Sequence, residues 1–381
     1  MVEWKYLNEI CGIYDGTHQT PKYTESGVKF VSVENINAPY SSQKYISEED
    51  YSKNYKTKPQ KGDVLMTRIG DVGTCAVLDN DEPIAYYVSL ALLRPNVQFV
   101  QSNYVKYILE SNIGKRELRK KTLLTAVPLK INLGDVGKIK LPIPSLSEQE
   151  RIVSILDTFT SSIDNLKQQI AQRRKQYEYY RDQLLDLEGK EGVEMKMLGD
   201  FCDTLSGFPF DSSQFRDEGI QLMRGANIKR GYFDFSQELN KYWISSEGLE
   251  KYLLEPNDII ISMDGSLVGR SFCYLRSDHL PLLLVQRVAR IRTKENYKYV
   301  YYNITKSFPD YVDKKKTAGA IPHISMKDIN GFIIPVPSLS EQQRIVDILD
   351  KFETSIQNLE AQLSQREKQY EYYRNKLLTF E

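Results

Sequence analysis

The sequence predicts an α+β protein in which two mixed α/β globular domains alternate with two long helices. Three observations lead to this prediction: an internal repeat that covers the whole chain, an unbroken helical periodicity at the end of each repeat, and strand-like apolar runs elsewhere. The length of 381 residues also exceeds what a single hydrophobic core usually holds. The expected architecture is therefore a pseudo-two-fold internal repeat.

The repeat is clearest in the phrase Lys-Gln-Tyr-Glu-Tyr-Tyr-Arg, which occurs at 175–181 and again at 368–374. Around it, residues 142–188 and 335–381 are identical at 31 of 47 positions without a gap. Near the start of each copy, Glu3-Trp-Lys-Tyr-Leu resembles Glu194-Met-Lys-Met-Leu. These matches predict four segments, which are a globular domain at 1–141, a helix at 142–190, a globular domain at 191–334 and a helix at 335–381.

Each long helix has a start signal, because a serine precedes a glutamate by three residues at Ser145 to Glu148 and at Ser338 to Glu341. No Pro or Gly interrupts the residues that follow, so each helix can extend for roughly 39 residues, or about 58 Å. A globular domain of this size has a diameter of about 30 to 40 Å. A helix could instead pack only against its own domain, but its length favours a coiled coil between the two copies.

The positions that we expect on the seam between the helices recur at heptad-like spacing. They are Ile152, Ile155, Phe159, Ile163, Leu166, Ile170, Tyr177, Tyr180 and Leu184 in the first copy, and Ile345, Ile348, Phe352, Ile356, Leu359, Leu363, Tyr370, Tyr373 and Leu377 in the second. Arg173 and Arg366 fall in the same register. If the two helices run antiparallel, the repeated tyrosines of each helix should meet the Ile-Val end of the other helix.

The globular domains are expected to contain several strands followed by a helix and a basic stretch. The predicted strands are Val28–Val33, Asp63–Thr67, Thr74–Leu78, Tyr86–Leu93, Asp258–Ser262, Phe272–Leu275 and Leu283–Ile291. The predicted helices are Asn103–Ser111 and Tyr297–Lys306. A final strand should lead into the Pro-x-Pro sequence before each long helix.

Composition limits the classes of function. The chain has 51 Lys plus Arg and 51 Asp plus Glu, so bulk electrostatics would not hold it on a polyanion, and any nucleic-acid contact must come from local patches. The four cysteines show no CxxC spacing and are expected to be reduced thiols in a cytoplasmic protein without a zinc site. We expect neither a membrane span nor a secretory signal.

The motifs that hold common cofactors are missing from the sequence. There is no Gly-x-Gly-x-x-Gly, no Walker A loop, no His-Glu-x-x-His and no Gly-x-Ser-x-Gly. The nearest nuclease-like match, Asp310 with Asp313 and Lys315, leaves too short a spacing for a metal site. We therefore expect a non-catalytic protein with no cofactor, no catalytic residue and no metal.

Local patches of basic and hydrogen-bonding residues are the remaining candidates for a functional surface. Basic clusters precede Pro128 and Pro322 in equivalent places, and glycine-flanked turns carry one arginine each, able to donate two hydrogen bonds to a guanine edge. A charge run is usually a solvated face, and these residues could also be ordinary turn residues. The candidate DNA-binding residues are Arg68, Lys115, Arg119, Lys120, Lys121, Arg224, Asn227, Lys229, Arg230, Arg270, Lys314, Lys315, Lys316 and His323.

The order of these segments resembles the specificity subunit of a type I restriction-modification system, over essentially the whole chain. The motifs that carry the resemblance are Pro142–Val153 and Pro335–Val346, the sequences Gly-Asp-Val-Leu at 62–65 and Asn-Asp-Ile-Ile at 257–260, and Gly-Ala-Ile-Pro-His-Ile at 319–324. The first copy departs from the last motif and reads Thr-Ala-Val-Pro-Leu-Lys-Ile. This departure puts in doubt any base-reading role at Leu129.

The resemblance implies two target-recognition domains, each reading one half of a bipartite, asymmetric DNA target. It also implies that the two long helices pair as an antiparallel coiled coil and set the spacing of these domains. It further implies that two modification subunits dock on this chain and methylate adenines. ATP-dependent restriction subunits are expected to join the full complex. Two rival readings remain. The first is a non-catalytic coiled-coil adaptor whose repeated domains bind proteins, and the second, more distant, is an enzyme that acts alone.

Overall fold

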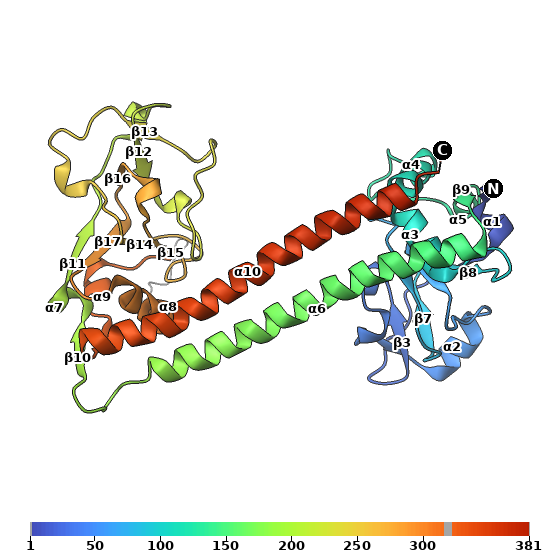
Figure 1. Cartoon of the computed structure of the whole chain (residues 1–381), viewed down its shortest axis with the longest axis horizontal. Coiled ribbons are helices and arrows are strands. Elements are labelled where there is room, and N and C mark those ends of the chain that lie inside the picture. Colours follow the sequence, from blue (N-terminus) through green and yellow to red (C-terminus); the bar gives the residue numbers. More distant parts are fainter. Residues whose placement is uncertain (1, 316–321, 381) are drawn as a thin grey trace. The chain divides into compact units, whose positions relative to one another are not determined.

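The computed structural model describes residues 2–315 and 322–380. The chain forms two compact units, and both long helices run through each of them (Figure 1). Unit 1 consists of residues 1–168 and 360–381, and unit 2 consists of residues 169–359. The boundary cuts each long helix, so a unit holds one globular domain, the start of one helix and the end of the other.

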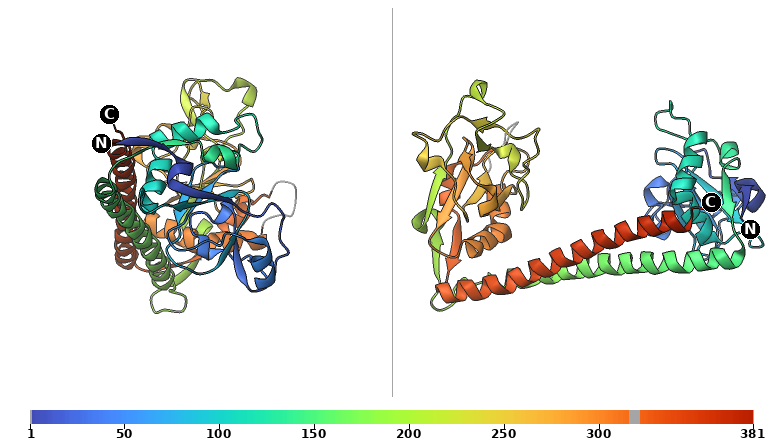
Figure 2. Two further views of the ribbon diagram at one scale, coloured as in Figure 1. Left: turned by 90° about the vertical axis from the view of Figure 1, so that its right-hand side faces the viewer. Right: turned by 45° about the horizontal axis from the view of Figure 1, so that its top comes forward.

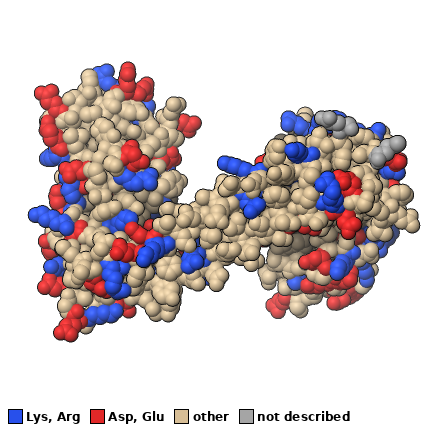
Figure 3. Space-filling model, in the orientation of Figure 1, with Lys and Arg blue, Asp and Glu red and all other residues tan. Residues whose placement is uncertain are grey.

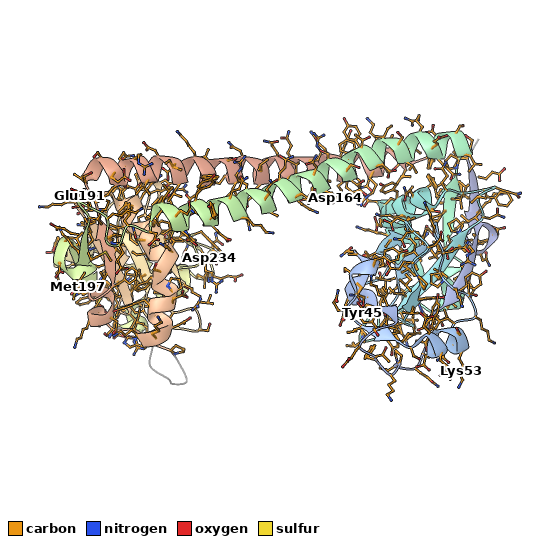
Figure 4. All side chains as sticks on the ribbon, turned by 90° about the horizontal axis from the view of Figure 1, so that it is seen from below. Tyr45, Lys53, Asp164, Glu191, Met197 and Asp234 are labelled. Atoms are coloured by element: carbon orange, nitrogen blue, oxygen red, sulfur yellow. The ribbon has the colours of Figure 1, made fainter. Side chains whose placement is uncertain are left out.

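Unit 1 contains three sheets, and its buried residues form two hydrophobic clusters. The four-stranded antiparallel sheet has the order β2-β8-β5-β6, with β2 at Cys11–Asp15, β8 at Leu90–Pro95, β5 at Val64–Thr67 and β6 at Cys75–Val77. The three-stranded sheet has the order β4-β3-β7, with β4 at Tyr45–Ile46, β3 at Val28–Val31 and β7 at Ile84–Tyr86. The small sheet with Tyr45 and the helix with Lys53 lie on the side of unit 1 away from α6 (Figure 4).

Unit 2 repeats this arrangement strand for strand. Its four-stranded sheet has the order β11-β17-β14-β15, with bounds Cys202–Ser206, Val288–Thr293, Ile259–Ser262 and Phe272–Tyr274. Its three-stranded sheet has the order β13-β12-β16, with bounds Tyr242–Trp243, Ile220–Met223 and Leu282–Leu284. The parallel pair of each small sheet, β3 with β7 and β12 with β16, joins strands that are distant in sequence. The predicted α+β class and its internal repeat are confirmed.

A two-stranded sheet closes each globular domain by joining its beginning to its end. In unit 1, β1 (Glu3–Tyr6) pairs with β9 (Lys140–Ile143), and in unit 2, β10 (Glu194–Met197) pairs with β18 (Ile333–Val336). The Pro-x-Pro sequences therefore end these strands. Each pair fixes the point from which a long helix departs.

The helices of the two units also correspond. Unit 1 has α1 at Leu7–Ile10, α2 at Glu48–Asn54, α3 at Ser102–Glu110, α4 at Asn112–Lys121 and α5 at Leu133–Val136. Unit 2 has α7 at Leu198–Phe201, α8 at Tyr297–Lys315 and α9 at Met326–Asn330. The long helices are α6 at Leu146–Leu184 and α10 at Leu339–Leu377, each with 39 residues. Short 3-10 helices lie at Val33–Asn35, Pro39–Ser41, Ser212–Gln214, Gly225–Asn227, Glu250–Tyr252 and Ser277–His279.

Antiparallel pairing of the long helices is visible within each unit by itself (Figure 2). In unit 1, Phe159 stacks on Tyr373 with ring centroids 5.4 Å apart, and Lys167 pairs with Glu367 at 3.6 Å. In unit 2, Tyr180 stacks on Phe352, also at 5.4 Å. As predicted, the repeated tyrosines meet the Ile-Val end of the other helix.

The predicted seam is only part of the apolar surface of these helices. Ile152 and Ile345, which we placed on the seam, are 0% exposed and belong to the globular cores, as do Leu156 and Leu349, which the heptad pattern omitted. Leu378, just beyond the end of α10, is also 0% exposed in the core of unit 1. Each helix start therefore packs on its own domain, as the rival reading proposed, and pairs with the other helix as well.

Two predicted strands are wrong in extent. The predicted strand Tyr86–Leu93 is divided between β7 and β8, and Leu283–Ile291 is divided between β16 and β17, because a turn separates them at Tyr87 and at Val285. In each case the chain leaves the small sheet and enters the large one. The predicted helix Tyr297–Lys306 instead continues to Lys315, whereas its counterpart in unit 1 is broken at Ser111 into α3 and α4.

Candidate nucleic-acid interface

The candidate interface in unit 1 lies at the end of the large sheet where β5 finishes and β8 begins. The Arg68 N–H donates to the Ser89 carbonyl at 2.9 Å, and the Ile131 N–H donates to the Arg68 carbonyl at 3.0 Å. The Gly70 N–H donates to the Leu129 carbonyl at 2.7 Å. We call residues 68–73 and 123–130 tip 1. The main-chain bonds hold its two segments together.

Unit 2 builds the same frame from different residues. The Met263 N–H donates to the Arg287 carbonyl at 3.0 Å, the Ile324 N–H to the Met263 carbonyl at 3.0 Å, and the Gly265 N–H to the Pro322 carbonyl at 3.1 Å. We call residues 263–269, 287 and 322–323 tip 2. Arg68 therefore corresponds to Met263 and not to Arg270.

The frame also corrects the comparison of the two Pro-containing segments. Lys130 pairs with Ile69 in a β-bridge, and His323 pairs with Asp264 in the equivalent bridge. His323 therefore corresponds to Lys130. Alignment of the two Pro-containing segments had instead placed His323 opposite Leu129, one residue earlier. The extra residue in the first copy lies in the loop before this bridge.

Glycine is required at one position of each tip. Gly70 has a φ of 82° and Gly265 has a φ of 104°, where a side chain would be strained. A Cβ added at either glycine would meet no heavy atom within 4 Å. The glycines are therefore needed for the backbone turn, and not for packing.

Arg68, predicted as a base reader, is instead a buried residue of the sheet. It is 6% exposed, and its Nη2 lies 2.6 Å from Oδ1 of Asp15. Its Nη1 donates to the Ile131 carbonyl at 3.4 Å. In this structure the guanidinium is used to hold β2 and the tip segments together, which argues against a base contact.

Arg270 is also engaged within its own unit. Its two terminal nitrogens lie 3.1 and 2.6 Å from the two carboxylate oxygens of Asp313 on α8. This bidentate pair is about one third exposed on each side. Arg270 therefore lies near the surface, but it must release Asp313 before it can donate both hydrogen bonds to a base.

The cluster between residues 224 and 230 divides into structural and exposed members. Asn227 is 0% exposed. Its side chain accepts from the Arg224 N–H at 3.2 Å and donates to the carbonyl of Asp234 at 2.9 Å. Asp234 is labelled in Figure 4. Lys229 lies 3.9 Å from Asp234, and Arg230 is exposed. Arg230 thus remains the accessible candidate of this cluster, and Asn227 shapes the turn.

The basic clusters lie on helices beside the tips. Lys115, Arg119 and Lys120 are exposed on α4, Lys121 is partly exposed, and Glu117 lies 2.6 Å from Lys120. In unit 2, Lys314 and Lys315 are exposed at the end of α8, and Lys316 lies outside the described residues. Elsewhere on the visible face, basic and acidic side chains are interspersed (Figure 3). The α4 cluster is therefore a local feature of tip 1.

Tip 2 has a polar cluster that contains one residue the sequence analysis missed. The Arg287 side chain is 65% exposed, and its Nη1 lies 2.6 Å from Oδ2 of Asp264. Nδ1 of His323 lies 2.5 Å from Oδ1 of the same carboxylate. Burial raises the pKa of Asp264, but the hydrogen bonds from Arg287 and His323 outweigh it, so the pKa is lowered. Arg287 also has a φ of 66°. The one signal for it in the sequence is that Gln286-Arg287 interrupts an apolar run.

Tip 1 differs from tip 2 at the bridge, where Ile69 and Lys130 replace Asp264 and His323. It also has apolar side chains on the preceding loop, whose counterpart in unit 2 lies outside the described residues. Val127 is 99% exposed, and Leu124 is 55% exposed. Leu123 and Leu129 are also classed among the exposed large hydrophobic residues. The two units therefore present different chemistry from one frame.

Among residues 2–315 and 322–380, no group of three or more His, Cys, Asp or Glu is placed to hold a metal ion. In the same residues, no helix has the length and apolar character that crossing a membrane requires.

Comparison with known proteins gives relatives along both repeats. The chain is 36% identical over 269 residues to the EcoR124I/EcoR124II specificity subunit of Escherichia coli, an alignment that covers 65% of each chain. It is 31% identical to the EcoAI specificity subunit of E. coli, over 45% of this chain and 30% of that one. The chain thus spans less than two thirds of these two relatives. A putative specificity subunit of Haemophilus influenzae is 28% identical over 100% of this chain and 96% of its own.

Solved structures share the fold at low sequence identity. A type I restriction-modification S subunit from M. genitalium has a TM-score of 0.62 at 15% identity, covering 100% of this chain and 97% of that one. A chain from a study of complex assembly in a type I restriction-modification system has a TM-score of 0.63 at 18% identity, covering 99% and 96%.

A family model described as "Type I restriction modification DNA specificity domain" matches residues 1–173 and 190–367. These two matches include both globular domains and most of both long helices. The chain therefore belongs to the type I restriction-modification DNA specificity family.

Proposed function

We propose that this chain is the DNA sequence-recognition subunit of a type I restriction-modification complex. Each globular domain, over 1–141 and 191–334, reads one half of a bipartite, asymmetric target. The chain itself catalyses no reaction. The observation that carries this proposal is that one main-chain frame appears twice, with Ile69 and Lys130 at its bridge in tip 1 and Asp264 and His323 at the same bridge in tip 2. Different side chains on equal frames are suited to two different half-sites.

The proposed partners follow from the family and from the repeat. Modification subunits, which methylate adenines, bind the chain, and ATP-dependent restriction subunits join the complete complex. The repeated helix ends expose equivalent aromatic pairs, Tyr179 with Tyr180 and Tyr372 with Tyr373, which supports two equivalent modification subunits. Because the target is chromosomal or invading DNA, we place the protein in the cytoplasm.

We also propose that the segments 142–190 and 335–381 set the spacing between the two half-sites. Their helices have 39 residues each, or about 58 Å. Adding one heptad to both helices adds about 10 Å, which corresponds to roughly three base pairs. The spacer in the recognised sequence should widen by this amount, and the half-sites should not change.

Methylation mapping tests the proposal. Cells that carry the modification subunit with and without this chain are compared, and a single bipartite motif should be methylated only when the chain is present. The purified complex should bind that motif with a strong salt dependence. Tight binding to the partner protein without any DNA selectivity would instead support the adaptor.

A further inference from the structure

The apolar part of tip 1 is an exposed loop with a fixed shape. The Leu123 N–H donates to the Lys130 carbonyl at 2.8 Å and closes the loop, and the Ala126 N–H donates to the Leu123 carbonyl at 3.2 Å. The bond from Gly70 to Leu129 and the bond from Ile131 to Arg68 attach the loop to the sheet. The loop is therefore held in place by the buried frame below it.

The apolar side chains of this loop are exposed. Val127 is 99% exposed, Leu124 is 55% exposed, and Leu123 and Leu129 are 40% and 41% exposed. Apolar side chains gathered on a fixed loop of a globular domain indicate a surface that becomes covered on binding. Within 123–130, Thr125 and Lys130 are the side chains that can form hydrogen bonds, so the loop offers little hydrogen-bonding readout.

The charge beside the loop indicates what covers it. The helix α4 leads directly into the loop and carries Lys115, Arg116, Arg119, Lys120 and Lys121 against the single acidic residue Glu117. Glu117 is bound to Lys120. A cationic helix beside an apolar tip is complementary to a nucleic-acid duplex, because the helix faces phosphates and the apolar side chains meet bases.

Resting on the proposed function, we infer that the loop 123–130 is an apolar wedge that inserts Val127 and Leu124 at a base step of the half-site read by unit 1. Leucine and proline side chains are used in this way by proteins that partly unstack and kink DNA. The wedge reads the half-site through the cost of unstacking a particular step, which depends on the sequence of that step. Tip 2, with Arg287 and His323, reads its half-site through hydrogen bonds instead.

The experiment uses the complete complex with its modification subunit and duplexes that carry 2-aminopurine at successive positions of the mapped target. Binding of the unaltered complex should raise the 2-aminopurine fluorescence at one step in one half-site. The double variant Leu124→Ser/Val127→Ser should lose this signal and bind the specific duplex about tenfold more weakly. Its affinity for random DNA and its salt slope should stay unchanged, because α4 is intact.

Val97 provides a matched control, since it is 78% exposed and follows the opposite end of β8. The Val97→Ser complex should keep both the fluorescence signal and the affinity. Specific binding without unstacking at any position would overturn the wedge. Loss of affinity when thymine is replaced by uracil, without any unstacking, would also overturn it and would indicate a contact with the thymine methyl group. Loss of the modification subunit in the double variant would assign the loop to protein binding. If the unaltered complex selected no sequence at all, the proposed function would fail as well.

Discussion

The two units differ most where they are proposed to read DNA and least where the long helices meet. The stacked pair Phe159 and Tyr373 in unit 1 and the pair Phe352 and Tyr180 in unit 2 have the same centroid distance of 5.4 Å, with interplanar angles of 26° and 27°. At the tips, by contrast, the Ile69–Lys130 bridge of unit 1 is replaced by Asp264–His323 in unit 2.

This difference separates the residues that build the frame from those that diversify it. Buried polar groups with several hydrogen bonds are costly to change, because each loss leaves backbone groups unpaired. Side chains that project from a tip with a fixed main chain can change with little effect on folding. The same fold can therefore carry two specificities.

The largest effect is expected at the glutamine that joins each long helix to its domain. Gln149 is 0% exposed, accepts from the Gln101 N–H at 3.0 Å and donates to the Phe99 and Pro144 carbonyls at 2.9 Å. Gln149→Leu leaves these groups without their partner, so the free energy of unfolding should fall by about 3 kcal/mol. Urea unfolding followed by circular dichroism measures the loss.

Gln342 is the matched position in unit 2, where it accepts from the Asn296 N–H at 3.2 Å and donates to the Pro337 carbonyl at 2.9 Å. Gln342→Leu should destabilise the chain by a similar amount. A loss in one unit alone would show that the frames are not energetically equivalent.

The next effect separates the two units at the buried arginine. Asp15 and Arg68 of unit 1 correspond in strand register to Ser206 and Met263 of unit 2. Arg68→Met removes the buried partner of the Asp15 carboxylate, which keeps its 2.8 Å contact with His18, and should cost about 2 kcal/mol of unfolding free energy. The double variant Arg68→Met/Asp15→Ser copies unit 2 and should recover most of that loss.

Thermal and urea unfolding of the three proteins form a double-mutant cycle. If Arg68→Met instead left stability unchanged and abolished discrimination at one base pair, Arg68 would be a base reader, as the sequence first suggested. Such a result would also mean that the ion pair opens when DNA binds.

Local sequence patterns predicted the elements whose signals are local. The serine caps and the absence of Pro and Gly were sufficient to place α6 and α10. Heptad spacing predicted that Tyr180 would meet the region of Phe352 only in combination with the antiparallel packing that the family resemblance implied. The candidate site was predicted less well, because pairing between strands decides it. Arg68 lies on a glycine-flanked turn like a surface residue, but Asp15 on a distant strand holds it inside. Arg287 was hidden in a run of strand-forming residues.

A smaller effect is expected from the polar residues of tip 2. Arg287→Ala should weaken discrimination in only one half of the target by about 1 to 3 kcal/mol. Lys315→Ala, at the exposed end of α8, should instead weaken binding to all sequences and lower the salt slope by about 1. Competition binding with half-site mutants at several salt concentrations distinguishes the two. An equal loss for Arg287→Ala on specific and random DNA would place it among the phosphate contacts.

The smallest effect concerns a half-buried carboxyl group on α10 at a position where the two copies of the repeat differ. Glu353 occupies the place that Thr160 has in the first copy, and it accepts a 3.3 Å hydrogen bond from the Tyr177 hydroxyl. Its surroundings also include Tyr302, Asp350 and Lys298. Burial raises the pKa of Glu353, although the nearby Tyr302 hydroxyl, which donates to Asp350, and the hydrogen bond from Tyr177 oppose this. The ionised form is therefore less stable in the folded chain than in the unfolded one.

The sign of the pH dependence follows from this shift. A raised carboxyl pKa gives stability that is complete below the unfolded pKa and is lost as the pH rises through the folded pKa. Glu353→Gln keeps an oxygen acceptor for Tyr177 but cannot ionise. The free energy of unfolding of the unaltered chain should therefore fall by about 1 kcal/mol or less between pH 4 and pH 8, and the variant should not show this fall. Urea unfolding over this range, with the exposed Glu371→Gln as a control, measures the difference. If the two variants had identical pH profiles, Glu353 would be solvated as freely as a surface glutamate, and the helix pairs of the two units would be equivalent at this position too.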